Sequence, residues 1–278
     1  MAKHHLFWLN SRYCLNISSC WTYYIFQITK YDIISLHFKT DMEHKLNEKD
    51  VAILLLAGSG TRIYEDIQIK KQFYPINHRE LYLYSLDALL KSGLFERIVL
   101  VIDKEDQSRI VSNLKSKIQL PEGTEVSVVY GGKDRNESVH HGLISLKDIG
   151  YDRAVFIHDA ARPLLEMDEL LELHEKIRHH DALSLVLPIH DSVLREKNGK
   201  ITYVDRKNLY RVLTPQVFVY SEILKLYESG YDKKDTDDFK KAASKGLDCQ
   251  LVRGNAENFK ITEIDDLKLL ESVINHKV

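Results

Sequence analysis

The sequence has 278 residues, 44% of them hydrophobic, and a formal net charge of −2. This length and composition predict one large α/β domain, or one domain with an appendage. The near-neutral charge gives no electrostatic reason to expect nucleic acid or an anionic membrane as a partner, and no apolar run approaches the roughly 18 residues that span a bilayer. Three cysteines without a C-x-x-C pair fit a reducing cytoplasm better than a disulfide framework or a zinc site.

Residues 1–48 differ in composition from the rest of the chain. They contain no Gly, Pro or Val but hold both tryptophans, Trp8 and Trp21. The longest apolar run, around residues 6–9, is too short for the core of a signal peptide. A polar stretch then begins at Met42 and leads into the first strong strand. We therefore expect residues 1–48 to be an atypical N-terminal extension, arising from an upstream start or forming a packed accessory segment, and residues 49–278 to be the functional domain.

A glycine-containing loop follows the first predicted strand, Val51 to Ala57. Gly58 and Gly60 allow a sharp turn with exposed backbone N–H groups, which suits an anion. The loop lacks the third glycine of a dinucleotide fingerprint and the G-K-[ST] of a Walker loop. It carries instead Arg62 and Lys71, whose charges can neutralise phosphate oxygens. The alternative is an ordinary strand-to-helix turn with a solvated basic face.

Beyond this loop, short apolar runs alternate with amphipathic stretches of helical length. Further strands are predicted at Arg97 to Asp103, Glu125 to Tyr130, Arg153 to His158, Ala182 to Ile189, Gln216 to Tyr220 and Asp248 to Val252. Helices are predicted at Arg79 to Ser92, Glu105 to Lys117, Glu137 to Leu146, Met167 to His180, Asp237 to Lys245 and Glu263 to Asn275, the last opened by a capping box of Thr262 and Asp265. This alternation predicts an α/β fold, a Rossmann-like, mostly parallel sheet with helices on both faces and ligands at the carboxyl ends of its strands.

One segment breaks the alternation. Residues 188–207 are polar and contain Asn198-Gly199, a strong signal for a two-residue hairpin turn. A hairpin with so few apolar residues cannot bury itself in its own domain. We expect it to project as an arm and to contact a partner chain.

Polar clusters follow the other apolar runs at the same predicted edge. In chain order they are GGKDRNESV (131–139), HDAARP (158–163), DR (205–206), TPQ (214–216) and NFKIT (258–262). With the A-G-x-G-x-R loop and K-Q, this ordered set resembles the 2-C-methyl-D-erythritol 4-phosphate cytidylyltransferase family, from about Val51 to Val273. The motifs are individually weak but highly specific together.

The resemblance implies an enzyme, a CTP-dependent nucleotidyltransferase of non-mevalonate isoprenoid biosynthesis. It would transfer a cytidylyl group from CTP to 2-C-methyl-D-erythritol 4-phosphate and release pyrophosphate, as a cytoplasmic homodimer using Mg²⁺. By motif match the catalytic residues are Arg62, Lys71 and Lys260. The nucleotide-binding residues are Ala57, Gly58, Gly60, Gly131, Gly132, Ser138 and Asp159, and Asp159 is also the metal ligand. The residues that bind the acceptor phosphate are Arg162, Ser192, Arg206 and Thr214.

The chain departs from the family pattern at three points. Lys70 stands where proline is usual before K-Q, the spacing from Arg62 to Lys71 is longer than usual, and Leu194 replaces a cation in the arm. The loss at Leu194 leaves open a close relative, ribitol-5-phosphate cytidylyltransferase, which makes CDP-ribitol. A catalytically silent nucleotide-binding protein is a third possibility, against which the retained Arg62, Lys71 and Lys260 argue.

Structural roles are the alternative for the individual site residues. Asp159 and Arg162 can form a simple ion pair, Arg206 can be a solvated charge of the arm, and Lys260 can be a lysine flanking a helix. The thirteen histidines show no H-E-x-x-H or comparable ligand spacing, so we interpret them as surface or core residues.

Overall fold

Short apolar runs form the strands of a central sheet in the computed structural model, which describes residues 22–28, 33–39, 49–58, 68–149, 153–230 and 237–277. Within those residues the sheet has the order β1-β2-β7-β6-β3-β8-β12-β9-β13. Its strands are β1 (Thr22–Ile28), β2 (Ile33–Lys39), β3 (Asp50–Leu55), β6 (Phe95–Ile102), β7 (Glu125–Tyr130), β8 (Ala154–Asp159), β9 (Ala182–Pro188), β12 (Tyr210–Val219) and β13 (Cys249–Arg253). A small second sheet pairs β4 (Pro75–Ile76) with β5 (Arg79–Glu80).

The middle of the large sheet is mostly parallel. β3 pairs in parallel with β6 on one side and with β8 on the other, β7 lies parallel to β6, and β13 lies parallel to β9. β12 runs antiparallel to both of its neighbours, β8 and β9. Because the chain leaves β3 towards β6 and returns on the other side of β3 as β8, a topological switch point lies at the carboxyl ends of β3 and β8. Open α/β sheets bind their ligands at such points.

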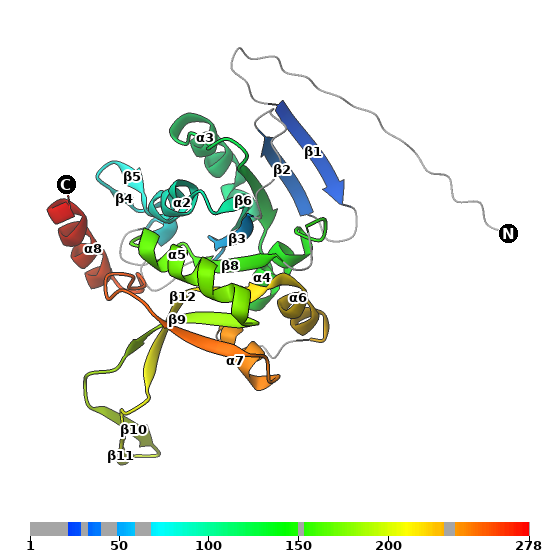
Figure 1. The fold of residues 1–278 in the computed structure, drawn as a ribbon. Coiled ribbons are helices and arrows are strands. Elements are labelled where there is room, and N and C mark those ends of the chain that lie inside the picture. The colour runs from blue at the N-terminus through cyan, green and yellow to red at the C-terminus, as the bar shows by residue number, and fades with distance from the viewer. Residues whose placement is uncertain are drawn as a thin grey trace.

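Helices cover both faces of the sheet (Figure 1). Alternate residues of β3 face opposite ways, with Ala52 and Leu54 in one buried cluster and Val51 and Ile53 in another. The first cluster includes α2 (Leu81–Ser92), α3 (Gln107–Lys117) and α5 (Met167–Lys176), and the second includes α4 (Arg135–Ile144), α6 (Tyr220–Glu228) and α7 (Asp238–Ser244). Single 3-10 turns form η1 (Lys71–Phe73), η2 (Lys104–Asp106) and η3 (Ile177–His179). The predicted α/β architecture is confirmed.

The C-terminal helix α8 (Ile264–Lys277) has its own small apolar cluster. Leu267 and Leu270 pack with Ile76 of β4 and Leu81 of α2. The same cluster includes Ile261, which directly follows the predicted catalytic Lys260. This packing fixes the segment before α8 against the body of the domain.

The predicted arm is a separate two-stranded hairpin that projects from the sheet (Figure 1). β10 (Val193–Lys197) pairs with β11 (Lys200–Val204). Asn198 and Gly199 have positive φ values of 54° and 76°, as a two-residue turn requires. The hairpin prediction is therefore confirmed.

Several predicted boundaries are wrong. β12 begins at Tyr210, well before the predicted Gln216. The prediction missed the first residues of this strand because they are exposed and lack an apolar pattern. α4 begins at Arg135, where the carboxylate of Asp134 accepts a hydrogen bond from the Glu137 N–H and caps the helix.

The predicted capping box of α8 is also wrong. Asp266, rather than Asp265, accepts hydrogen bonds from the N–H groups of Thr262 (2.7 Å) and Glu263 (2.9 Å). The Thr262 hydroxyl donates instead to the carbonyl of Lys260. Asp265 pairs with Lys268 on the surface of the helix.

Part of the N-terminal extension joins the sheet. β1 and β2 form an antiparallel hairpin, and β2 pairs antiparallel with the outer edge of β7. The rest of residues 1–48 lies outside the described residues, and the division at residue 48 stays a prediction. Across the residues that the structure describes, no helix is long and apolar enough to cross a membrane.

Candidate active site

The first polar turn of the site follows β3. Gly58 has a φ of 119°, which an L side chain rarely adopts, so glycine is required there. Its carbonyl accepts a hydrogen bond from the buried amide of Gln72, and its N–H donates to the carboxylate of Asp103. The Gly58 N–H therefore already has an acidic partner. Gly60 and Arg62, two of the predicted site residues, lie outside the described residues.

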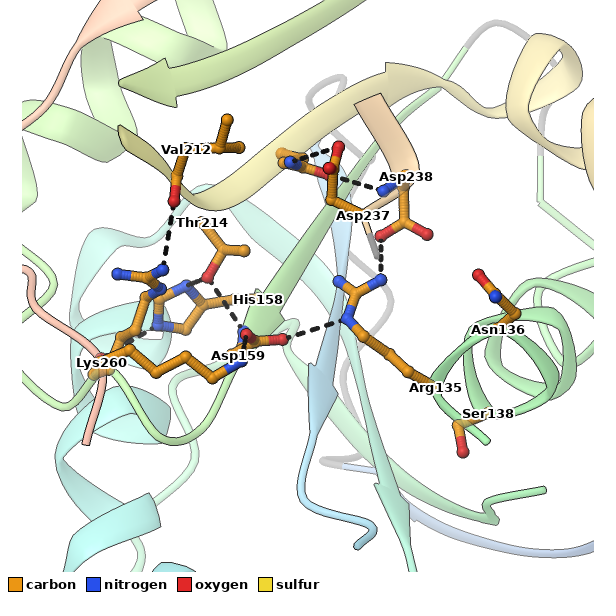
Figure 2. Close-up of polar contacts among 12 residues, drawn as sticks. Arg135, Asn136, Ser138, His158, Asp159, Val212, Thr214, Asp237, Asp238 and Lys260 are labelled. Carbon is orange, nitrogen blue, oxygen red and sulfur yellow. Dashed lines mark hydrogen bonds and ion pairs between the residues drawn. The ribbon is translucent and has the colours of Figure 1, made fainter. Parts of the chain in front are cut away.

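Asp159 ends β8 at the switch point and is largely buried. Its Oδ2 accepts a hydrogen bond from Lys260 Nζ at 2.6 Å, and its Oδ1 lies 3.5 Å from Arg135 Nε (Figure 2). Burial opposes ionisation of the carboxyl, but the nearby charges of Arg135, Lys260 and Arg162 outweigh it and hold the pKa of Asp159 well below its usual value. Asp159 is thus a fixed negative charge.

Lys71 reaches the same segment from the other side. Its Nζ donates to the carbonyl of Ile261 at 3.0 Å, and the Ile261 N–H donates to the carbonyl of Ala161 at 2.8 Å. Lys71 is far from Lys260 in sequence but contacts Ile261, the residue next to Lys260 in the strap, residues 258–263, that precedes α8. The structure therefore brings together Lys71, Lys260 and Asp159, and Lys260 is more than a helix-flanking lysine.

The glycines after β7 lie against Ala57 and Ser138. A Cβ added at Gly131 would come within 2.6 Å of the Ala57 Cβ and 2.9 Å of the Ser138 Oγ, so only glycine fits. The Gly132 N–H donates to Ser138 Oγ, which in turn donates to the carbonyl of Asp134. The predicted nucleotide-binding residues Ala57, Gly131, Gly132 and Ser138 thus meet in one compact turn.

Two predicted acceptor-binding residues, Arg162 and Thr214, are buried beside His158. The Thr214 hydroxyl accepts a hydrogen bond from the Asp159 N–H and contacts His158 Nδ1 at 3.0 Å (Figure 2). His158 Nε2 donates to the carbonyl of Arg162, because a carbonyl can only accept. Burial lowers the pKa of His158 to about 4, so its imidazole is neutral at pH 7.

Arg162 does not form the simple ion pair with Asp159. Its guanidinium donates to the main-chain carbonyls of Asn258 and Val212, and its buried Nε has no hydrogen-bond partner among the described residues. That nitrogen is a buried donor with no hydrogen bond in the part of the chain that the structure describes, which is uncommon and costly.

The other two predicted acceptor-binding residues are not brought to this cluster. Ser192 lies exposed at the start of the arm, and Arg206 lies exposed at its base, where the guanidinium donates to the carbonyl of His190. Leu194, the position that lacks the expected cation, pairs across the hairpin with Tyr203. The structure therefore separates the predicted site into a buried part in the domain and an exposed part on the arm.

Sequence reasoning missed the role of Arg135. Its Nη1 lies 2.8 Å from Asp238 Oδ2, so one guanidinium joins Asp159 to the start of α7 (Figure 2). Gln216 supports the same helix, because its Oε1 accepts hydrogen bonds from the N–H groups of Asp238 and Phe239. The arginine of G-G-x-x-R-x-x-S-V was a signal for this position, but its partner Asp238 follows much later in the chain.

Comparisons with known proteins point to one family. A family model described as 2-C-methyl-D-erythritol 4-phosphate cytidylyltransferase matches residues 51–276. A relative of that name from Thermotoga neapolitana is 36% identical over 79% of this chain and 94% of its own, and one from Desulforamulus reducens is 32% identical over 82% and 96%. The solved structure of 4-diphosphocytidyl-2C-methyl-D-erythritol synthase from Anaerococcus prevotii is 25% identical, with a TM-score of 0.70 over 82% of this chain and all of that one.

Proposed function

The chain belongs to the 2-C-methyl-D-erythritol 4-phosphate cytidylyltransferase family, and from that premise we propose how its residues carry out the reaction. The enzyme transfers a cytidylyl group from CTP to 2-C-methyl-D-erythritol 4-phosphate and releases pyrophosphate. We assign these roles because Lys71, Lys260 and Asp159 converge at the carboxyl ends of β3 and β8. The family match favours this acceptor over ribitol 5-phosphate.

The reaction asks little covalent chemistry of the protein. A phosphate oxygen of the acceptor attacks the α-phosphorus of CTP, a new P–O bond forms, and the bond to the bridging oxygen breaks as pyrophosphate leaves. Catalysis of this kind is mainly positioning and neutralisation of charge. Lys71 and Lys260 supply positive charge at the triphosphate, together with Arg62. When CTP binds, its phosphates compete with Asp159 and the Ile261 carbonyl for these ammonium groups.

The turn that joins Ala57, Gly131, Gly132 and Ser138 is the proposed cytosine site. Because side chains are small or absent there, the base can approach the backbone closely. The N–H groups of these four residues already donate hydrogen bonds within the fold, so the base would meet main-chain carbonyl oxygens. The backbone of this turn has a fixed position, since the Ser138 hydroxyl accepts a hydrogen bond from Gly132 and donates one to Asp134. Acceptors in fixed positions can select cytosine by the hydrogen bonds that its exocyclic amino group donates.

Mg²⁺ is the proposed cofactor, with Asp159 as its protein ligand. Magnesium usually takes one or two carboxylates plus substrate phosphates, and the low pKa of Asp159 keeps that carboxylate ionised. In the described part of the chain no group of three or more His, Cys, Asp or Glu side chains is able to hold a metal ion. The bound ion would neutralise phosphate charge, and Lys260 would then turn from Asp159 towards the nucleotide.

The acceptor site is proposed to combine two subunits. Arg162 and Thr214 lie in the domain, whereas Ser192 and Arg206 lie on the arm. The arm exposes Leu194 (52%), Ile201 (62%) and Tyr203 (78%). The hairpin register puts these three side chains on one face together with Glu196, which accepts a hydrogen bond from the Gly199 N–H. This mostly apolar face is suited to a second copy of the chain. A homodimer would cover this face and bring Arg206 to the neighbouring domain.

We also propose that the protein is located in the cytoplasm. The three cysteines of the sequence suit a reducing compartment, and within the described residues Cys249 is free. Separating cell extracts and assaying cytidylyltransferase activity in each fraction tests it.

The experiment that tests the function is a pyrophosphate-release assay. Purified protein is incubated with CTP and Mg²⁺, with either 2-C-methyl-D-erythritol 4-phosphate or ribitol 5-phosphate as acceptor. We expect rapid release with the first and little with the second. A preference for ribitol 5-phosphate would overturn the acceptor, and absence of release with both would overturn the activity. Omitting Mg²⁺ and adding a chelator should abolish release.

The dimer is tested separately by sedimentation velocity. Tyr203→Asp places a charge in the apolar face of the arm, so the variant should sediment as a monomer while the wild type sediments as a dimer. Lys200→Asp is the matched control, because the register places Lys200 on the other face of the hairpin. A wild-type monomer at micromolar concentration would contradict the proposal.

A further inference from the structure

Two adjacent lysines, Lys70 and Lys71, diverge at the end of the glycine loop. Lys71 extends towards the strap before α8. Lys70 extends away from it and contacts three carboxylates, those of Asp103 (2.9 Å), Glu105 (2.9 Å) and Asp106 (2.8 Å). The Lys70 side chain is only 18% exposed, so this contact is more protected than an ordinary surface ion pair.

Asp103 connects Lys70 to the other end of the loop. It follows β6, and its two carboxylate oxygens lie 3.3 and 3.2 Å from the N–H of Gly58. Gly58 precedes the segment that carries Gly60 and Arg62, and Lys70 follows it. One carboxylate therefore contacts residues on both sides of the segment that carries Gly60 and Arg62.

The charge balance of this cluster is unfavourable without Lys70. Burial disfavours the ammonium, but the hydrogen bonds that it donates to Asp106, Asp103 and Glu105 outweigh burial and raise the pKa of Lys70, so it stays charged. Asp106 is poorly solvated, with 12% of its side chain exposed, and this burial raises the pKa of its carboxyl. Without the lysine, like charges would repel each other and Asp103 would turn towards water and away from Gly58.

We propose that Lys70 is a positioning residue, which together with Asp103 clamps Gly58, after β3, to the start of η1 and thereby sets the approach of Lys71 to CTP. The backbone of Lys70, at φ −58° and ψ 129°, is in the region that proline would fix. Lysine thus adopts the backbone conformation that proline would have here, and it adds an ion pair with Asp103. Asp103 accepts from the Gly58 N–H, whereas Gln72 donates to the Gly58 carbonyl, so the two contacts are independent.

The kinetic test rests on the proposed binding of CTP at the loop. Lys70→Met should lower kcat/KM for CTP by about 10- to 100-fold, because a small misplacement of binding groups is costly. The KM for the acceptor should stay within about twofold, and Lys70→Arg should restore most of the loss by keeping the charge. Lys91→Met is the matched control, since Lys91 pairs with a single carboxylate on an exposed helix surface.

A double-mutant cycle identifies the partner. Asp103→Asn should lower kcat/KM for CTP in the same direction, and adding it to Lys70→Met should cost little more, because both changes break one connection. Additive losses would overturn the clamp. So would a Lys70→Met enzyme with unchanged kinetics, or equal effects on CTP and the acceptor.

Hydrogen exchange tests the clamp without any substrate, so failure of the proposed function is distinguishable from failure of this inference. In the free protein the Gly58 amide should exchange about tenfold faster in Lys70→Met than in the wild type, as expected for loss of a hydrogen bond to a charged group. Amides of β8 should be unchanged. Equal exchange at Gly58 in a folded variant would overturn the proposal, and if Lys70→Met does not fold, Asp103→Asn is measured in its place.

Discussion

The two parts of the predicted site differ in how they are held. The part in the domain is fixed by contacts within one chain, whereas the part on the arm is exposed. In the domain, Asp159 is held by contacts with Thr214, Lys260 and Arg135. On the arm, Arg206 and the apolar face with Tyr203 are exposed. The proposed nucleotide side is thus preorganised within one chain, whereas the proposed acceptor side also uses exposed residues of the arm, which our proposal brings from a second subunit. Changes in the domain should therefore affect the chemical step, and changes in the arm should affect acceptor binding.

The largest effect is expected in the domain, at Lys71. Lys71→Ala should lower kcat by about 10²- to 10³-fold, by analogy with loss of one preorganised donor at a developing charge. The KM for the acceptor should change little. Steady-state kinetics with both substrates varied gives the answer, and a near wild-type kcat would remove Lys71 from the catalytic role.

A second large effect concerns pH and the buried His158. Its folded-state pKa of about 4 lies below the unfolded value of roughly 6.5, so the unfolded chain binds more protons between these values. The free energy of unfolding should therefore fall as the pH drops from about 6.5 to about 4, by about 3 kcal/mol. Urea denaturation across that range measures it. His158→Asn should flatten the slope, and an unchanged slope would show that other groups cause it.

A smaller effect is expected on the arm. Arg206→Ala should raise the KM for the acceptor by about tenfold, the loss of one hydrogen bond to a charged group, while the KM for CTP stays within about twofold. Isothermal titration with CTP alone provides the control. A selective rise in the KM for CTP would place Arg206 on the nucleotide side and reverse the comparison.

The smallest effect is expected from the extension. Deleting residues 1–41 should leave kcat and both KM values largely intact, because every matched motif lies downstream. The deletion removes β1 and β2 and leaves β7 at the edge of the sheet. Loss of folded, active protein would show that this hairpin is an accessory part of the domain.

The sequence predicted the order of the elements because buried strands and amphipathic helices leave local patterns. It also predicted that the polar turns after β3, β7 and β8 lie at one edge, because strand ends of a parallel sheet share an edge. Ser192 and Arg206 on the arm do not join them. It could not predict contacts between distant side chains. The Arg135 link to Asp238 and the Lys70 link to Asp103 depend on residues from other elements. The start of β12 at Tyr210 was missed because exposed strand residues carry no apolar signal.

Subunit complementation tests most directly the central claim, that Arg206 completes the active site of the partner subunit. Lys71→Ala and Arg206→Ala proteins are unfolded together, refolded and assayed at low acceptor concentration. About half of the dimers should be mixed, and each should contain one intact site of two, so roughly a quarter of the wild-type activity should return. A mixture no more active than its parents, despite verified subunit exchange, would place Arg206 in its own subunit's site or outside any site.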